Sequence, residues 1–267
     1  MPISESFRES VGMSIGIVLM GLLVGILVGL TGVGGAALLT PFLILIGVNP
    51  LVAVGTDLVY NSITKLFGSI QHFRQKTIDF KLAKYLAIGS VPSAILAISL
   101  LQFLGDSIYF KEEIIKQALG YVLIIVALTT IIRTLFSSKF KDNRLMLKPV
   151  EEKIPLTIGL GVVLGFAVGL TSIGSGSLFA LAMLFLYKLR PSKLVGTDIA
   201  HAFILVTASG IFYIGLGNVD FLLVANLLCG SIPGVILGST WSAKVPVKPL
   251  RTLISVIIFI SGLKLLS

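Results

Sequence analysis

The sequence is poor in the residues that build catalytic and metal sites in soluble proteins. Its 267 residues include one cysteine and two histidines. The single cysteine, Cys229, excludes an internal disulfide bond. The sequence contains no clustered Cys/His metal motif, no Walker loop and no nucleophile elbow. We therefore expect no enzymatic activity, no metal and no cofactor.

Charged residues are also scarce, at 12% of the chain, whereas hydrophobic residues make up 55%. With a mean hydropathy of +1.04, the chain has too few polar side chains to cover a soluble globule of its size. Apolar stretches recur along the sequence, and many are close in length to the roughly 20 residues that a helix needs to cross a bilayer. The composition predicts an all-α polytopic protein whose surroundings are membrane lipids.

The apolar segments fall into two groups of five, separated by the polar stretch 137–153. We expect a first membrane repeat at 1–136, a linker at 137–153 and a second membrane repeat at 154–267. Helical segments are expected at 11–30, 36–48, 52–72, 80–104 and 114–136, and again at 155–171, 178–189, 194–215, 220–243 and 249–266.

The two groups are copies of one ancestral unit. The stretch GILVGLTGVGGAALLTP at 25–41 returns as GFAVGLTSIGSGSLFAL at 165–181. Further on, Val-Gly-Thr-Asp at 54–57 returns at 195–198, and Gly-Ser-Val-Pro at 89–92 returns as Gly-Ser-Ile-Pro at 230–233. Several motifs in one order and register indicate a duplication. Each copy crosses the membrane an odd number of times, whether its first two segments span or form a re-entrant hairpin, so the repeats are expected to have inverted topology.

Basic residues are unevenly distributed between the two sets of helix ends. Most of the 21 lysines and arginines, including Arg251 near the start of the last segment, fall on the linker side. The positive-inside rule predicts that this side faces the cytoplasm and that both termini lie outside the plasma membrane. The basic residues behind the net charge of +9 then set the membrane topology and can bind anionic lipid headgroups. We therefore expect no nucleic-acid partner.

Small residues interrupt both copies of the motif, at 31–35 and at 171–177. Lipid cannot satisfy the backbone groups of such a break, so it must face protein or a water-filled cavity. The helix that resumes after it offers N–H groups and a positive dipole end, which attract anions. We expect both breaks to bind a small anionic substrate, with close packing through small residues as the alternative explanation. The residues concerned are Thr31, Gly34, Gly35, Thr171, Ser172, Ser175, Gly176 and Ser177.

The third segment carries a polar stripe. Asp57, Asn61 and Lys65 are spaced i, i+4, i+8, and Lys65 lies about 12 Å beyond Asp57 along a helix, near the bilayer midplane. A charge at this depth is costly and by default functional. We expect Asn61 and Lys65 to bind the substrate and Asp57 to be a candidate for proton coupling, with an Asp57–Lys65 ion pair as the alternative for the lysine.

The equivalent segment of the second repeat keeps Asp198 and adds His201, but has lost the rest of the stripe. Both residues are candidates for proton handling, with protons as a candidate coupling ion. A hydrogen-bonded structural histidine is an equally good explanation for His201. Helix capping is the alternative for Asp57 and Asp198.

These motifs resemble the sulfite exporter TauE/SafE family, also called the TSUP anion transporters. The resemblance rests on GLTGVGGAALLTPFL, GLTSIGSGSLFALAML and the Gly-Thr that follows each, and it covers about 11–266. It implies a duplicated helical membrane protein that moves sulfite, sulfoacetate or related sulfonates, often outward and with coupling to protons. The chain departs from the family in having Gly-Thr-Asp at 55–57 and 196–198 where Gly-Thr-Ser is common.

The sequence therefore predicts a secondary transporter, an exporter by resemblance, of a small anion that works by alternating access. A passive anion channel would have the same repeat, breaks and polar stripe, and is an alternative. A non-transporting membrane assembly module and a cation transporter that uses Asp57 and Asp198 are further alternatives. The sequence does not determine the oligomeric state.

Overall fold

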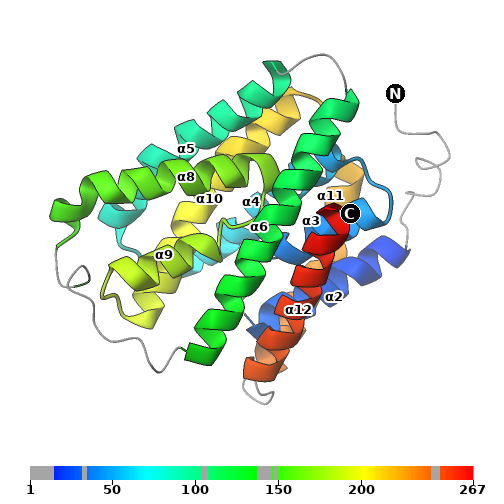
Figure 1. The fold of residues 1–267 in the computed structure, drawn as a ribbon. Coiled ribbons are helices and arrows are strands. Elements are labelled where there is room, and N and C mark those ends of the chain that lie inside the picture. The colour runs from blue at the N-terminus through cyan, green and yellow to red at the C-terminus, as the bar shows by residue number, and fades with distance from the viewer. Residues whose placement is uncertain are drawn as a thin grey trace.

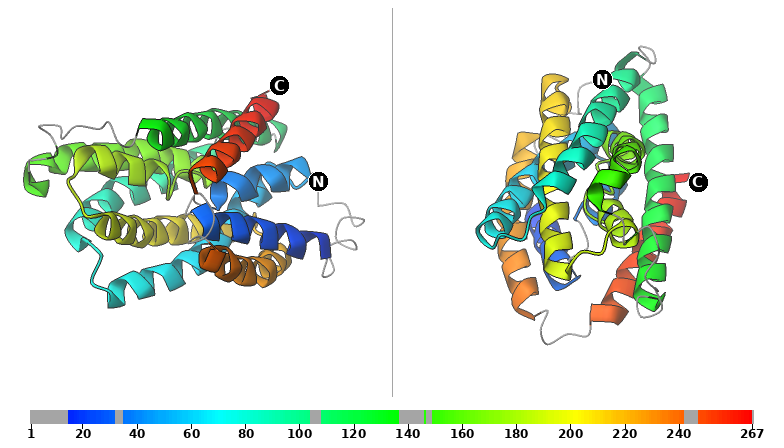
Figure 2. Two further views of the ribbon diagram at one scale, coloured as in Figure 1. Left: turned by 90° about the horizontal axis from the view of Figure 1, so that it is seen from below. Right: turned by 90° about the vertical axis from the view of Figure 1, so that its left-hand side faces the viewer.

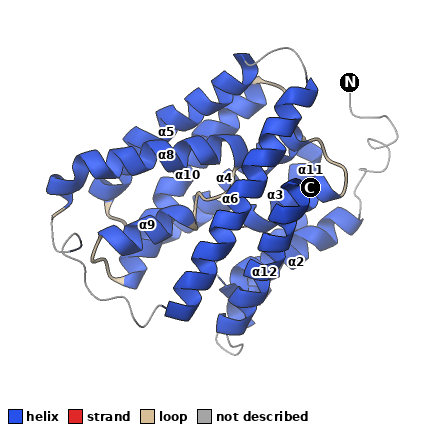
Figure 3. Cartoon of the chain, viewed as in Figure 1, coloured by secondary structure: helices blue, strands red, loops and turns tan. Residues whose placement is uncertain are grey.

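The computed structural model describes residues 15–31, 35–103, 108–136, 146, 149–241 and 247–266. Every regular element in these ranges is a helix, as the composition predicts (Figure 3). In chain order the elements are α2 (Ile15–Thr31), α3 (Ala36–Leu45), α4 (Pro50–Arg74), α5 (Phe80–Phe103), α6 (Ile108–Phe136), η1 (Val150–Lys153), α8 (Ile154–Thr171), α9 (Leu178–Leu186), α10 (Pro191–Gly215), α11 (Phe221–Trp241) and α12 (Val247–Leu266) (Figure 1).

All ten expected helical segments are present, and most of their ends lie within a few residues of the expected positions. The largest difference is at α6, which begins at Ile108 rather than near 114. Within the described ranges, six helices are long and apolar enough to cross a membrane: α5, α6, α8, α10, α11 and α12. The expectation of a polytopic helical membrane protein is therefore confirmed, while the boundaries of the two repeats and the linker stay predictions.

Two helices are half the length that a bilayer requires. Helix α3 has 10 residues and α9 has 9, which correspond to about 15 Å or less against a hydrocarbon core of about 30 Å. In the second copy, α8 ends where Ser172 adopts a left-handed conformation (φ 59°), and Gly174 follows at φ 101°. These two residues turn the chain out of α8 and into α9. The predicted break in the second repeat is thus present, whereas residues 32–34 of the first break lie outside the described ranges.

Helices of one half pack against helices of the other in matched pairs. Helix α2 packs along α11 and α5 along α8, while α4 packs against α10 and α6 against α12 (Figures 1 and 2). The pairs α2–α11 and α8–α5 are equivalent under the sequence repeat, and the other two pairs each join equivalent helices. Exchanging the two halves therefore maps each helix pair onto an equivalent pair, as an approximate two-fold axis would.

Glycines place the backbones of these pairs in direct contact. A Cβ on Gly25 would lie 2.5 Å from the carbonyl oxygen of Ser231, and one on Gly165 would lie 2.3 Å from that of Ser90. Each of these contacts maps onto the other under the repeat. The glycines inside α2 and α8, which precede the breaks, therefore serve close helix packing, as the alternative explanation proposed.

Equivalent helices run in opposite directions where they touch. In the α4–α10 pair, Ser62 contacts Thr207 and Ser69 contacts Ile199, so the numbering rises along one helix as it falls along the other. In the α6–α12 pair, Gly120 approaches Leu266 while Leu123 and Ile124 approach Gly262, so the numbering again rises along one helix as it falls along the other. Antiparallel contact between equivalent helices is what inverted repeats produce. The orientation of each half relative to the membrane remains a prediction.

Candidate functional site

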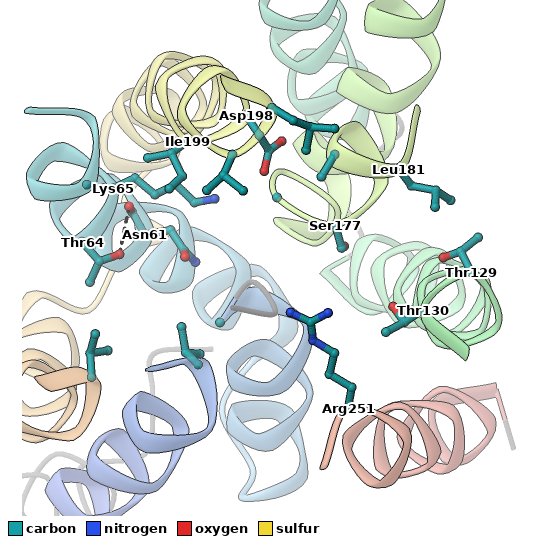
Figure 4. A pocket seen from close by; sticks show the side chains of 18 of the residues that line it. Asn61, Thr64, Lys65, Thr129, Thr130, Ser177, Leu181, Asp198, Ile199 and Arg251 are labelled. Atoms are coloured by element: carbon teal, nitrogen blue, oxygen red, sulfur yellow. Dashed lines mark hydrogen bonds between the residues drawn. The ribbon is translucent and has the colours of Figure 1, made fainter. Parts of the chain in front are cut away.

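A cavity of about 420 Å³ lies where the two halves meet (Figure 4). Gly35, at the end of the first break, and Gly176 and Ser177, at the end of the second, form part of its wall. Helices α4, α6, α10 and α12 supply the remaining polar side chains. The polar and charged lining residues are Asn61, Thr64, Lys65, Thr129, Thr130, Thr134, Ser177, Asp198 and Arg251.

Lys65 projects from the middle of α4 into this cavity (Figure 4). Its Nζ lies 3.4 Å from the backbone carbonyl oxygen of Ser175, in the second break. The lysine therefore joins a helix of the first half to the broken segment of the second. The structure brings it together with four other residues predicted for substrate binding, namely Gly35, Asn61, Gly176 and Ser177.

Arg251 is a second cationic residue in the cavity wall, and the sequence alone did not reveal it. The positive-inside argument assigned it to a cytoplasmic helix end, but α12 begins at Val247 and Arg251 lies one turn inside it. Its guanidinium reaches towards the centre of the cavity (Figure 4). The signal available in the sequence was an arginine two residues past Pro249, in a segment that otherwise reads as apolar helix.

The fifth helix of the first half was also given no role from sequence. Thr129, Thr130 and Thr134 of α6 line the cavity. Their hydroxyls donate to carbonyls of their own helix, for example Thr130 Oγ1 to the Val126 oxygen at 2.7 Å. Each hydroxyl oxygen keeps acceptor capacity. A Thr-Thr pair in an apolar helix was the signal that would have pointed to this face.

Asp57 lies behind the cavity wall rather than in it. It is fully buried, and Oδ2 accepts hydrogen bonds from Thr40 Oγ1 of α3 at 2.9 Å and from the Ser172 hydroxyl of the second break. Oδ1 accepts from Asn61 Nδ2 at 2.8 Å. Because α4 begins at Pro50 with Asn49 as its N-cap, the capping explanation for Asp57 is wrong. Asp57 instead ties the second break to the first half.

Replacing Asp57 by alanine is expected to lower the free energy of unfolding by about 2–4 kcal/mol, because three buried donors lose their acceptor. Unfolding of the purified protein in detergent measures this. Glu113→Ala, which removes an exposed acid of α6, is the control and is expected to change stability by less than about 0.5 kcal/mol. Equal stability of the two variants would contradict a structural role for Asp57.

Asp198 is the equivalent of Asp57, but the structure places it in the cavity wall (Figure 4). Since α10 begins at Pro191, capping is wrong for Asp198 as well. His201, one turn further on, is fully buried and does not line the cavity. Its Nε2 lies 2.8 Å from Ser90 Oγ, and its ring packs on Phe179 with 4.3 Å between centroids. Tyr60 and Ser231, also buried, occupy the equivalent positions in the first half.

The remaining predicted residues lie apart from the cavity or outside the described part of the chain. Thr171 is buried, donates to the Ala167 oxygen at 2.7 Å and accepts from the Ile173 N–H, so it shapes the break itself. Ser172 binds Asp57, and Ser175 contributes its carbonyl to Lys65. Gly34 and the side chain of Thr31 are outside the described residues. No cluster of three or more histidine, cysteine, aspartate or glutamate side chains capable of holding a metal occurs among the residues that are described.

A model of the family described as sulfite exporter TauE/SafE matches residues 17–265. The probable membrane transporter protein YjnA of Bacillus subtilis is 61% identical over 237 residues, which cover 89% of this chain and 93% of the relative. YdhB of the same organism, also named a probable membrane transporter protein, is 28% identical over 88% of this chain and 93% of its own length. No solved structure matches the chain.

The family match covers almost the whole chain, and it agrees with the helical fold, the apolar spans and the internal cavity. The chain belongs to the sulfite exporter TauE/SafE family and is a membrane transporter rather than an enzyme.

Proposed function

We propose that the protein is a secondary transporter that exports a small sulfur oxyanion or organosulfonate, such as sulfite or sulfoacetate, and that the cavity is its substrate site. One observation carries the proposal: Lys65 from the first half and Arg251 from the second enter the same cavity, beside the ends of both breaks. Charged side chains at membrane depth are expensive and mark transport pathways.

The size of the cavity supports a substrate larger than a bare tetraatomic ion. A volume of about 420 Å³ lies within the range of small-molecule sites and holds on the order of ten water molecules. An organosulfonate, or sulfite with part of its hydration shell, suits this space. The guanidinium and ammonium donors match the acceptor oxygens of a sulfonate group.

Alternating access accounts for the two short helices. Because α3 and α9 each begin at the cavity wall, movement of one half against the other would expose the site to either side in turn. Asp198 is the proposed proton-coupling group, since it is the acidic residue among the described lining residues. The clustering of basic residues supports a plasma-membrane orientation with the linker in the cytoplasm and both termini outside.

Counterflow in proteoliposomes tests this function and separates a carrier from a channel. Vesicles loaded with unlabelled sulfoacetate or sulfite are expected to take up the labelled anion several-fold faster than empty vesicles, because a carrier returns faster when loaded. A passive channel would show no acceleration. Protein-free vesicles are the control, and equal uptake of either anion with and without the protein would contradict the proposal.

A further inference from the structure

The two equivalent aspartates have different surroundings, and the sequence repeat shows why. Three side chains donate to Asp57: Thr40, Asn61 and Ser172. Under the sequence repeat, the positions equivalent to these three donors are Ala180, Ala202 and Gly32. None of these has a side-chain donor. The second copy therefore lacks the set of side chains that holds Asp57 behind the wall, and Asp198 lines the cavity.

The charges that face an occupant of the cavity come from three residues. Lys65 and Arg251 are cationic and Asp198 is anionic, and all three lie in the wall with their polar ends directed inwards (Figure 4). Asp57 does not join them, because it is fully buried behind the wall, where its carboxylate accepts hydrogen bonds from Thr40, Ser172 and the lining residue Asn61. The lining side chains thus carry one net positive charge.

We infer that Asp198, in its ionised form, is a charge-selecting residue, which makes the cavity complementary to a monoanion and unfavourable for a dianion of similar chemistry. Within a membrane protein, an uncompensated charge is poorly screened and costly. A monoanionic sulfonate neutralises the lining, whereas a dianion leaves one negative charge beside the carboxylate of Asp198. This inference rests on the proposed function and narrows its substrate to a monoanion. Bisulfite, the protonated form of sulfite, and simple alkanesulfonates fit the cavity, whereas sulfoacetate, a dianion at neutral pH, is disfavoured.

The contrast with Asp57 strengthens the assignment. Both aspartates descend from one position of the ancestral unit. In the first copy, Asp57 joins the second break to α3 by accepting hydrogen bonds from both. In the second copy the same residue type remains although the three donors are absent. A carboxylate kept in a cavity with two cationic residues sets the charge of whatever binds there.

Binding of two permanently ionised probes tests the inference. Isothermal titration of the purified full chain in detergent would compare methanesulfonate, a monoanion, with methanedisulfonate, a dianion. The wild-type protein is expected to prefer the monoanion by about tenfold or more, since one unit charge within a few ångströms outweighs that ratio at protein-like dielectric. Asp198→Asn raises the lining charge by one and is expected to reverse the preference.

A double variant guards against an indirect structural effect. Asp198→Asn combined with Arg251→Gln returns the lining to one net positive charge and is expected to restore the preference for the monoanion. A residue that acted only through packing would not be rescued by removing an arginine on another helix. Asp198→Glu keeps the charge and is expected to keep the wild-type preference.

The outcomes separate the two proposals. If the wild-type protein binds the sulfonates but Asp198→Asn leaves the ratio unchanged, charge selection by Asp198 is wrong while the proposed function stands. The same holds if the double variant behaves like Asp198→Asn alone. If the wild-type protein binds neither sulfonate and transports no sulfur oxyanion, the proposed function is wrong and the inference falls with it.

Discussion

Replacing Lys65 by methionine is expected to lower the initial rate of sulfite or sulfonate transport at least about a hundredfold. Methionine keeps most of the length and apolar volume of the lysine stem, so the change removes the ammonium while largely preserving the packing of α4. The cavity then loses one of its two cationic side chains, and the carboxylate of Asp198 is opposed by Arg251 alone. Loss of a charge-assisted contact of about 3 kcal/mol corresponds to this factor. Initial uptake into proteoliposomes at matched protein content is the measurement.

Lys84→Met is the matched control. Lys84 lies on α5, is exposed and does not line the cavity, so the same substitution there is expected to leave the transport rate within a factor of about two. The Lys65 variant should also keep wild-type thermal stability to within a few degrees. Undiminished transport by a folded Lys65→Met protein would remove this lysine from the mechanism.

Gly230→Ala is expected to destabilise the fold by about 3 kcal/mol or more. A Cβ at this position of α11 would lie 1.9 Å from the carbonyl oxygen of Val18 on α2, and the backbone cannot move away without separating the two helices. Because α2 and α11 are in contact along their length, separation at one point loses packing at several others. The yield of monodisperse protein and its unfolding midpoint in detergent measure the effect.

Gly159→Ala provides the opposite result from the same substitution. Nothing lies within 4 Å of the position of its added Cβ on α8. Alanine has the higher helix propensity, so this variant is expected to be unchanged or stabilised by up to about 1 kcal/mol. If both glycine variants were equally stable, close backbone contact between α2 and α11 would be contradicted.

Much of the architecture followed from local sequence patterns. Hydropathy identified the ten helical segments, and the repeated Gly-Leu-Thr and Val-Gly-Thr-Asp motifs identified the duplication. Both signals are periodic and depend on neighbouring residues, so they survive without knowledge of the partner helix. The break in the second repeat was also visible, since Ser172 and Gly174 lie in a run of small residues that interrupts an apolar segment.

The roles of individual polar residues were less accessible. From sequence, Asp57 and Asp198 look alike, because both follow Val-Gly-Thr in equivalent segments. Only their three-dimensional neighbours distinguish them, and Ser172, which binds Asp57, is 115 positions away in the chain. Arg251 was misplaced for a related reason: basic residues near helix ends normally face water, and the sequence does not show which face of α12 is turned towards the cavity.

By itself, the sequence determined that this protein is a duplicated helical membrane protein with an interrupted segment in each half and a lysine deep in α4. The tertiary structure decided which of the predicted residues share a cavity, brought in Arg251 and the threonines of α6, and separated Asp57 from Asp198. The physical reason is that membrane insertion depends on composition summed along each segment, whereas a site depends on how side chains from four helices converge.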